Sequence, residues 1–241
     1  MPRSAIRPIA IVPLGDCAAY IEFSGKLDLE VNALVQRLAA AVRARAAPWI
    51  RDVVPALGGL ALHYDPDHPA AGPEALRAAA TLVHECLEAG LDAAEAAPRL
   101  VEVPVCYGAD FGPDLEEVAK KTGLAPDEVV LRHAAAEYRV LMIGFAPGHA
   151  YMGGLDPKLG VPRRPTPRLL VAPGAVAIAN EQTVVYPYAI SGGWSVIGRT
   201  PLTVFDAGRA EPSLFAPGDR VRFRAIGAEA FLSLQHEHPG P

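Results

Sequence analysis

Proline sets the strongest limit on how this chain can fold, because fifteen of its 24 prolines lie beyond residue 98. Each proline fixes its own backbone angle and removes a hydrogen-bond donor, so it interrupts helices and inner strands. Short apolar runs lie between these prolines and the neighbouring glycines: Arg139–Ile143, Ala175–Ala179, Thr183–Tyr186, Ser195–Gly198 and Arg220–Arg224. Runs of this length and spacing are typical of a β-barrel or β-sandwich.

The amino-terminal part of the chain has longer patterns. Cys17–Phe23 is expected to be a strand. Val53–Pro55 and Leu60–Tyr64 are expected to form a hairpin, because Gly58-Gly59 supplies the turn between them.

Two helices are expected beside these strands. Apolar residues at helical spacing predict an amphipathic helix at Asp28–Arg45. Pro73 and Glu74 are typical of a helix start, and they predict a second helix. This helix is expected to bury Leu76, Ala80, Val83 and Leu87. Strands and helices in turn indicate a small α+β sandwich, which we assign to residues 1–92.

The second domain is expected at residues 99–233, after a linker at Ala93–Pro98. It begins with the alternating pattern of a strand at Leu100–Cys106. Two short helices are predicted next, at Asp114–Lys121 and Asp127–Ala136. The proline-bounded strands follow, so the fold class is α+β, with a β-barrel as the larger part.

Composition excludes several kinds of protein. The 241 residues are 51% hydrophobic, which is enough for a sizeable core. A net charge of -5 gives no basic surface for nucleic acid. No apolar run reaches the roughly 18 residues of a membrane helix. Three cysteines, odd in number and far apart, indicate reduced thiols and hence a cytoplasmic protein.

The sequence lacks the motifs of several self-sufficient catalysts. It has no phosphate-binding loop of the form GxxxxGK[ST]. Neither Ser191 nor Ser195 lies in a GxSxG nucleophile elbow. His84 and His133 stand singly in predicted helices, without metal-ligand spacing, so no metal is expected.

The segment Gly144–Arg168 is the main candidate for a site. It contains five prolines and four basic side chains, and it is expected to be a rigid, irregular loop. His149 follows Pro147-Gly148 and is the candidate catalytic residue, as a proton donor or anion contact. Its alternative role is a structural hydrogen-bond partner. Tyr151 should face the same way, and a ligand bound here should change its affinity between pH 5.5 and 8.

A second candidate is the segment PRRPTPR, residues 162–168. Its prolines force an extended backbone, which places Arg164 and Arg168 on one side, with Thr166 between them, and points Arg163 the other way. Two guanidinium groups on one side suit a carboxylate or phosphate. The alternative is salt bridges to one of two neighbouring acidic residues, Asp156 or Glu181.

Neutral and aromatic groups complete the candidate site. Gly192-Gly193 presents Trp194, either as the floor of a ligand pocket or as a core aromatic. The full set of expected substrate-binding residues is Tyr151, Arg164, Thr166, Arg168, Gln182, Thr183, Tyr186, Trp194 and Arg199. This set suits a small anionic or amide substrate, and it lacks paired carboxylates for acid–base catalysis.

Several long motifs in a fixed order carry a resemblance over nearly the whole chain. They are GDCAAYIEF, VVPALGGLALHYDP, VPVCYGADFGPDLEEVAKKTGL, GFAPGHAYMGGLDPKLGVPRRPTPR, EQTVVYP, GGWSVIGRTPL and PGDRVRF. With these motifs the chain resembles the family of the 5-oxoprolinase B subunit, also called KipI-like or allophanate hydrolase subunit one. That family is similar to one half of the carboxyltransferase region of urea carboxylase.

The resemblance implies an α+β amino-terminal domain followed by a cyclophilin-like β-barrel. It also implies a companion protein, similar to the C subunit of 5-oxoprolinase or to allophanate hydrolase subunit two. With that companion, the complex would use ATP to open a lactam such as 5-oxoproline, and the chain alone would be nearly inert. Two alternatives are a carboxyltransferase module acting with a biotin-bearing partner and a KipI-like inhibitor of a sensor histidine kinase.

The sequence departs from the family motifs at two places. His149-Ala150 stands where the family usually has Phe-Pro, and Asn180-Glu181 stands where it often has two glycines. These changes add a titratable ring and a carboxylate near the expected pocket, so the substrate could be another carboxyl- or amide-bearing molecule.

Overall fold

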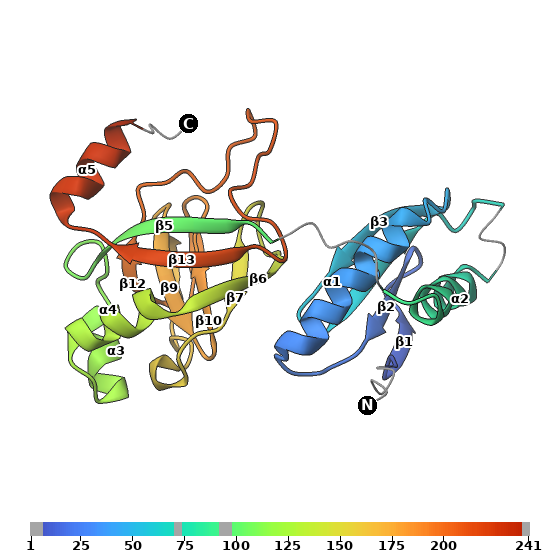
Figure 1. Ribbon diagram of the computed structural model, residues 1–241, viewed down its shortest axis with the longest axis horizontal. Helices are drawn as coiled ribbons and strands as arrows, with labels where there is room; N and C mark the ends of the chain where they lie inside the picture. The colour runs from blue at the N-terminus through green and yellow to red at the C-terminus, as the bar shows by residue number, and fades with distance from the viewer. Residues whose placement is uncertain (1–6, 70–73, 92–97, 238–241) are drawn as a thin grey trace. The chain divides into compact units, whose positions relative to one another are not determined.

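The structure is a computed structural model, and it describes residues 7–69, 74–91 and 98–237. The chain divides into two compact units, Met1–Ala97 and Pro98–Pro241. Figure 1 shows the first unit in blue to green and the second in green to red. The expected linker at residues 93–98 lies almost entirely outside the described residues.

The first unit contains one antiparallel sheet with strand order β1-β2-β4-β3. Its strands are β1 (Ala10–Pro13), β2 (Ala18–Glu22), β3 (Ile50–Pro55) and β4 (Gly59–Tyr64). The hairpin expected across Gly58-Gly59 is confirmed, because β3 and β4 pair from Ile50–Tyr64 to Pro55–Leu60. β1 was not predicted, since its short segment contains Pro13 and has no alternating pattern.

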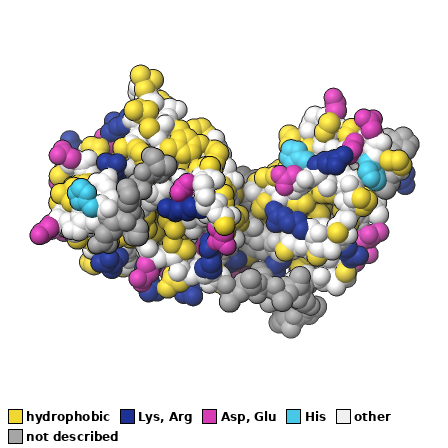
Figure 2. All heavy atoms as spheres, turned by 90° about the horizontal axis from the view of Figure 1, so that it is seen from above, with side chains coloured by type: hydrophobic (Ala, Val, Ile, Leu, Met, Phe, Trp, Pro, Cys, Tyr) yellow, Lys and Arg dark blue, Asp and Glu magenta, His cyan; other side chains and the backbone are white. Residues whose placement is uncertain are grey.

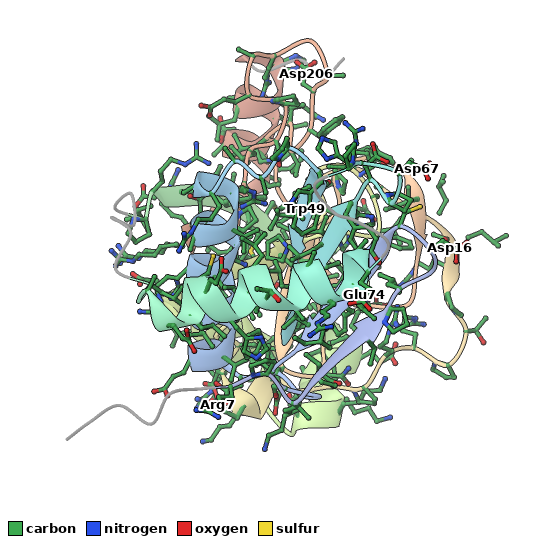
Figure 3. All side chains as sticks on the ribbon, turned by 90° about the vertical axis from the view of Figure 1, so that its right-hand side faces the viewer. Arg7, Asp16, Trp49, Asp67, Glu74 and Asp206 are labelled. Atoms are coloured by element: carbon green, nitrogen blue, oxygen red, sulfur yellow. The ribbon has the colours of Figure 1, made fainter. Side chains whose placement is uncertain are left out.

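Two helices, α1 (Leu29–Ala44) and α2 (Ala75–Glu88), pack against each other and against this sheet. In Figure 3, α2 crosses the front of the unit and Glu74 marks its first turn. α1 starts where predicted, because the Asp28 carboxylate accepts hydrogen bonds from the N–H groups of Glu30 and Val31.

The buried face of α2 matches the prediction at Val83 and differs from it at three other positions. Ala79, Leu82, Val83 and Cys86 are buried. Leu76, Ala80 and Leu87, which were expected in the core, are only half-buried. The helix has apolar residues on two adjacent stripes, so helical spacing alone does not choose between them, and packing on the sheet favours the stripe with Cys86.

The second unit is a closed barrel with strand order β10-β7-β6-β13-β5-β12-β9. Its strands are β5 (Leu100–Tyr107), β6 (Glu137–Ile143), β7 (Ala150–Gly153), β9 (Ala175–Ala179), β10 (Gln182–Val185), β12 (Ser195–Arg199) and β13 (Arg220–Ala225). All neighbours are antiparallel except β5 and β13, which are parallel. The α+β class with a β-barrel is confirmed, and Figure 1 shows β5 and β13 side by side.

Shorter elements surround the barrel. They are α3 (Leu115–Thr122), α4 (Pro126–Ala135), the 3-10 turn η1 (Pro157–Leu159), the two-stranded sheet of β8 (Arg168–Val171) with β11 (Ile190–Gly192), and α5 (Ala228–Glu237). The helices α3 and α4 pack on each other and contact the barrel strands β12 and β13 (Figure 1). The segment 144–168 is less irregular than expected, because it contains β7 and η1.

The barrel has a separate core on each side of its wall. The interior core includes Val105, Val140, Met152, Ile178 and Ile197. A second cluster on the other face of β9, β10 and β12 includes Ala177, Val184, Tyr186, Trp194 and Val196, together with Val171 of β8. Because side chains alternate along a strand, β9, β10 and β12 each contribute to both cores.

The described surface shows no concentration of one charge on the face seen in Figure 2, where basic and acidic side chains are interspersed among hydrophobic ones. No helix among the described residues combines the length and apolar character needed to cross a bilayer.

Candidate functional site

Strand alternation separates the candidate residues of β10. Gln182 pairs with Gly153 and Ala179, and Val184 pairs with Tyr151 and Ala177, so Gln182, Val184 and Tyr186 face the outside of the barrel. Thr183 pairs with Met152 and Ile178 and therefore faces the interior. The three neighbours expected to share one pocket lie on opposite sides of the barrel wall.

Thr183 belongs to a buried chain of hydrogen bonds, which we call the interior relay (Tyr107, His133 and Thr183). The Tyr107 hydroxyl lies 2.8 Å from His133 Nδ1, and His133 Nε2 lies 3.0 Å from Thr183 Oγ1. Thr183 Oγ1 donates in turn to the carbonyl oxygen of Ala177 at 3.1 Å. Thr183 must then accept from Nε2–H, so Nδ1 accepts from Tyr107.

The interior relay is fully satisfied, and it explains why His133 can be completely buried. Burial lowers the pKa of His133 to about 3, so the ring is neutral. Thr183 is therefore held by core residues, and no described cavity reaches it. His133 carried no sequence signal beyond its position on the buried face of a helix.

Four rings outside the barrel form the aromatic cluster (His149, Tyr151, Tyr186 and Trp194). The His149 ring centre lies 4.9 Å from that of Tyr151 and 5.2 Å from that of Tyr186. Tyr151 in turn lies 5.9 Å from Trp194. His149 and Tyr151 thus face the same way, as their spacing predicted. Trp194, the residue before β12, packs against Tyr151.

His149 packs in this cluster as an aromatic side chain. Only 2% of its surface is exposed, and its Nδ1 has no hydrogen-bond partner in the structure. Burial lowers its pKa to about 4. A pKa of about 4 keeps the ring neutral between pH 5.5 and 8 and so gives no support to the expected change of ligand affinity in that range, which stays a prediction.

Tyr186 anchors the cluster to the β11–β12 turn. A Cβ atom on Gly192 would lie 2.1 Å from the Tyr186 hydroxyl, so only glycine leaves room for the phenol there. The backbone N–H of Trp194 bonds to the phenol oxygen. Burial nevertheless raises the pKa of Tyr186 to about 12, so this hydroxyl remains protonated.

The segment PRRPTPR, residues 162–168, crosses this region, and we call it the strap. Arg168 makes a bidentate ion pair with Asp114, with both Nη–Oδ distances at 2.7 Å. Arg164 Nη1 lies 2.9 Å from Asp114 Oδ1 and 2.8 Å from Glu117 Oε2. Asp114 is buried and also accepts a hydrogen bond from the Val196 N–H.

These ion pairs correct the expected partners of the strap. Arg164 and Arg168 do lie on one side, but they pair with Asp114 and Glu117 of the α3 start, rather than with Asp156 or Glu181. Asp156 pairs with Arg132 of α4 instead. Thr166 and Glu181 are exposed. The two arginines are thus neutralised within the protein, which suits holding the strap in place better than gripping a ligand.

Arg163 is the strap arginine that is not among the expected substrate-binding residues. It is exposed, and no ion pair is found for it among the described residues. Its charge acts on both Tyr151 and Tyr186, where it opposes the rise of their pKa that burial causes. Its alternation with Arg164 in an extended segment was the signal that placed it on the opposite side.

The larger of the described cavities lies elsewhere on the barrel unit, with a volume of about 650 Å³. Arg199 is the only residue of the predicted set that lines it. The other lining residues are Pro173, Gly174, Pro187, Tyr188, Thr200, Pro201, Leu202, Thr203, Phe205, Asp206, Ala207, Gly208 and Gln235. We call this cavity the Arg199 pocket. Sequence patterns missed most of its lining, because these residues come from turns and loops.

The predicted site residues thus fall into four places: the interior relay, the aromatic cluster, the strap and the Arg199 pocket. No group of three or more histidine, cysteine, aspartate or glutamate side chains suited to a metal ion is found in the described part of the chain.

Comparison with known proteins places these features in a family. Residues 9–215 match the family described as carboxyltransferase domain, subdomain C and D. The B subunit of 5-oxoprolinase from Bacillus subtilis (strain 168) is 38% identical over 232 residues, which cover 94% of this chain and 97% of that protein.

Solved structures are similar to this chain in fold. The crystal structure of TTHA0988 is 36% identical with a TM-score of 0.72, covering 88% of this chain but only 40% of that chain. The urea carboxylase of Kluyveromyces lactis has a TM-score of 0.74 at 16% identity, covering 99% of this chain and 24% of that chain. The second likeness shows a shared fold.

Proposed function

The chain belongs to the carboxyltransferase domain, subdomain C and D family, and on this premise we propose that it is one subunit of an ATP-dependent hydrolase that opens a lactam such as 5-oxoproline. The observation that carries the proposal is the 38% identity with a 5-oxoprolinase B subunit over 94% of this chain. Similarity of that extent covers both units of the fold.

The side chains support a subunit that depends on a companion. Ser195 is buried and its hydroxyl has no hydrogen-bond partner among the described residues, so none of them is placed to activate it as a base. Burial raises the pKa of the Cys106 thiol, which disfavours the nucleophilic thiolate. We propose that the reacting groups come from a companion similar to the C subunit of 5-oxoprolinase or to allophanate hydrolase subunit two.

ATP fits the residues of this chain poorly. The Arg199 pocket contains one arginine and no lysine, whereas a triphosphate carries several negative charges and needs several cations or a glycine-rich loop. We therefore assign nucleotide binding to the companion. We also propose a cytoplasmic location, because the three cysteines are free thiols.

The strap and the aromatic cluster have a supporting role in this proposal. Asp114 and the strap arginines fix the segment that crosses the outside of the barrel. The rings of Tyr151, Tyr186 and Trp194 pack into a rigid apolar cluster, and the charge of the exposed Arg163 acts on Tyr151 and Tyr186. These groups could bind an anionic or amide substrate only where the companion completes the site.

The decisive experiment measures hydrolysis of 5-oxoproline and ATP by the purified chain, by its companion and by both together. We expect turnover only with both proteins present. Substantial turnover by this chain alone would contradict the proposed division of labour. Turnover of ATP without ring opening by the pair would show that the substrate is a different molecule.

A second function, a carboxyltransferase module, is favoured by the fold shared with urea carboxylase at a TM-score of 0.74. It would require a biotin-bearing partner that carries the carboxyl group. Transfer of labelled carboxylate from a biotinylated carrier protein to urea, with no requirement for 5-oxoproline, would favour this function over the lactam hydrolase.

A further inference from the structure

The Arg199 pocket carries one positive charge without a negative counterpart. It contains two charged side chains, Arg199 and Asp206. Asp206 is already neutralised, because its Oδ2 lies 3.2 Å from Arg209 Nε and its Oδ1 accepts the Gly208 N–H. No carboxylate pairs with Arg199 among the described residues, so the pocket favours an anionic ligand.

Arg199 is held in place by neutral groups on two sides. Its Nε donates to the carbonyl oxygen of Pro173 at 2.9 Å, and its guanidinium carbon lies 5.9 Å above the ring of Phe231. Gly174, the residue after Pro173, approaches the backbone of Thr200 closely, since Gly174 has φ +75° and a Cβ there would lie 2.4 Å from the carbonyl oxygen of Thr200. A guanidinium fixed in this way loses little entropy on binding.

The rest of the pocket suits a small ring next to a carboxylate. Its apolar lining residues include three prolines, Leu202 and Phe205, and its uncharged polar side chains are the hydroxyls of Tyr188, Thr200 and Thr203 and the amide of Gln235. Thr200 Oγ1 accepts the Leu202 N–H at 3.3 Å, which leaves its hydroxyl proton for a ligand. Apolar walls with a few polar groups are typical of small-molecule sites.

The pocket also touches the glycine-rich motif that the family shares. Phe205, a wall of the pocket, packs against Gly148, where an added Cβ would lie 2.7 Å from the Phe205 Cβ. Gly148 directly precedes His149 of the aromatic cluster. Pro187 and Tyr188 follow Tyr186 of the same cluster along the chain. The Arg199 pocket and the aromatic cluster are therefore neighbours.

We propose that the Arg199 pocket binds a small monocarboxylate, such as a five-membered lactam acid, and that Arg199 holds its carboxylate. This proposal names the substrate class of the proposed function and rests on it. It also moves the carboxylate contact away from Arg164 and Arg168, whose charges Asp114 and Glu117 already balance.

Two ligands test the proposal, 5-oxoproline and 2-pyrrolidinone, which share a lactam ring but differ in the carboxylate. Titration calorimetry with the complex of this chain and its companion should show that Arg199→Met weakens 5-oxoproline binding about ten- to a hundredfold. Binding of 2-pyrrolidinone should not change. Arg199→Lys keeps the charge but loses the paired N–H donors of the guanidinium. Its affinity for 5-oxoproline should lie between those of wild type and Arg199→Met.

Arg224→Ala is the matched control, because Arg224 is an exposed arginine on β13 that does not line the pocket. It should bind both ligands as wild type does. Equal loss of both ligands in Arg199→Met would show a collapsed pocket and would overturn the carboxylate contact. Unchanged 5-oxoproline affinity in Arg199→Met, or no measurable binding to the wild-type complex at millimolar ligand, would also overturn it.

Failure of this inference is separable from failure of the proposed function. If the complex opens 5-oxoproline and Arg199→Met leaves its KM unchanged, the function stands and the pocket assignment is wrong. If the complex does not open 5-oxoproline but binds another small monocarboxylate, such as acetate or propionate, in an Arg199-dependent manner, the pocket assignment stands and the lactam function is wrong.

Discussion

At the scale of single residues, His149 and Asn180 depart from the family motif, and the structure shows the environment that each of them occupies. His149 stands where the family motif has phenylalanine, and it lies among three aromatic rings. Asn180 stands where the motif often has glycine, and it adopts a φ of 52° in the β9–β10 turn. Asparagine tolerates this left-handed region better than most residues. His149 thus fills an aromatic environment, and Asn180 adopts a backbone conformation that asparagine tolerates.

His149 should make the barrel unit sensitive to acid. Its pKa falls from 6.5 to about 4 on folding, so the unfolded chain binds its proton first as the pH falls. Stability is then full above pH 6.5 and is lost as the pH falls toward 4, by about 3 kcal/mol for this ring. Urea unfolding of His149→Phe between pH 4 and 7 should show a smaller loss than wild type.

His236→Gln, which removes an exposed histidine from the same unit, is the matched control and should keep the wild-type pH profile. His133 is also buried with a lowered pKa, so some acid sensitivity should remain in His149→Phe. An identical pH profile for His149→Phe and wild type would show that the His149 ring does not titrate as described.

At the scale of elements, the strap and the α3 start act as one structural unit. A buried carboxylate, Asp114, pairs with two arginines and one backbone N–H. Glu117 adds a second, more exposed partner, and Lys121 and Arg164 lower the pKa of Glu117 to about 2. A buried ion pair is costly to break on one side, because the remaining charges lose their partner.

Asp114→Asn should therefore destabilise the barrel unit by about 3 kcal/mol, since it leaves two arginines facing a neutral amide. Glu117→Gln should cost less than about 1 kcal/mol, because that pair is partly exposed to solvent. Hydrogen exchange of residues 162–168 should speed up only in Asp114→Asn. Equal effects of the two substitutions would mean that burial of Asp114 does not matter.

Sequence patterns predicted the elements in which apolar residues recur with a clear helical or strand spacing, or form one continuous run. The strand at Ala175–Ala179 has the predicted bounds, and α1 begins at its predicted cap. The patterns failed at β8 and β11, which have few residues and no alternation. Leu169 and Leu170 of β8 are both exposed, at 93% and 67%, so a hydrophobic pair there gives no sign of a strand.

The candidate site was harder to predict than the fold, because it depends on long-range partners. The strap arginines were placed on one side correctly, but Asp114 is fifty residues or more away in sequence, and no local spacing points to it. Thr183 was grouped with Gln182 and Tyr186, although period-two alternation separates it from both. Only strand bounds accurate to one residue would have shown that Gln182 and Thr183 lie in the same strand, β10, and therefore face opposite sides.

At the scale of the whole molecule, the two units have independent cores. The first unit has one hydrophobic cluster around its sheet, which includes Trp49. The second has the barrel interior and the outer cluster, which includes Trp194. These are the two tryptophans of the chain. Each unit therefore contains one buried fluorescent reporter.

Thermal unfolding should proceed in two separable transitions. Trp194→Phe leaves the signal of Trp49, and Trp49→Phe leaves that of Trp194, so each variant follows one unit. Adding Asp114→Asn should lower the Trp194 transition by about 10 °C and leave the Trp49 transition unchanged. Equal shifts in both signals would show that the units unfold together.

The parallel pair of β5 and β13 also governs when the barrel can close during synthesis. β5 is the first barrel strand to leave the ribosome and β13 is the last, and they pair from Leu100 with Arg220 to Val105 with Ala225. The first unit can finish folding early. Until β13 is synthesised, however, the barrel stays open, because one edge of β5 and one edge of β6 have no partner strand. Unpaired edges invite aggregation, so this interval is where the growing chain most needs a chaperone.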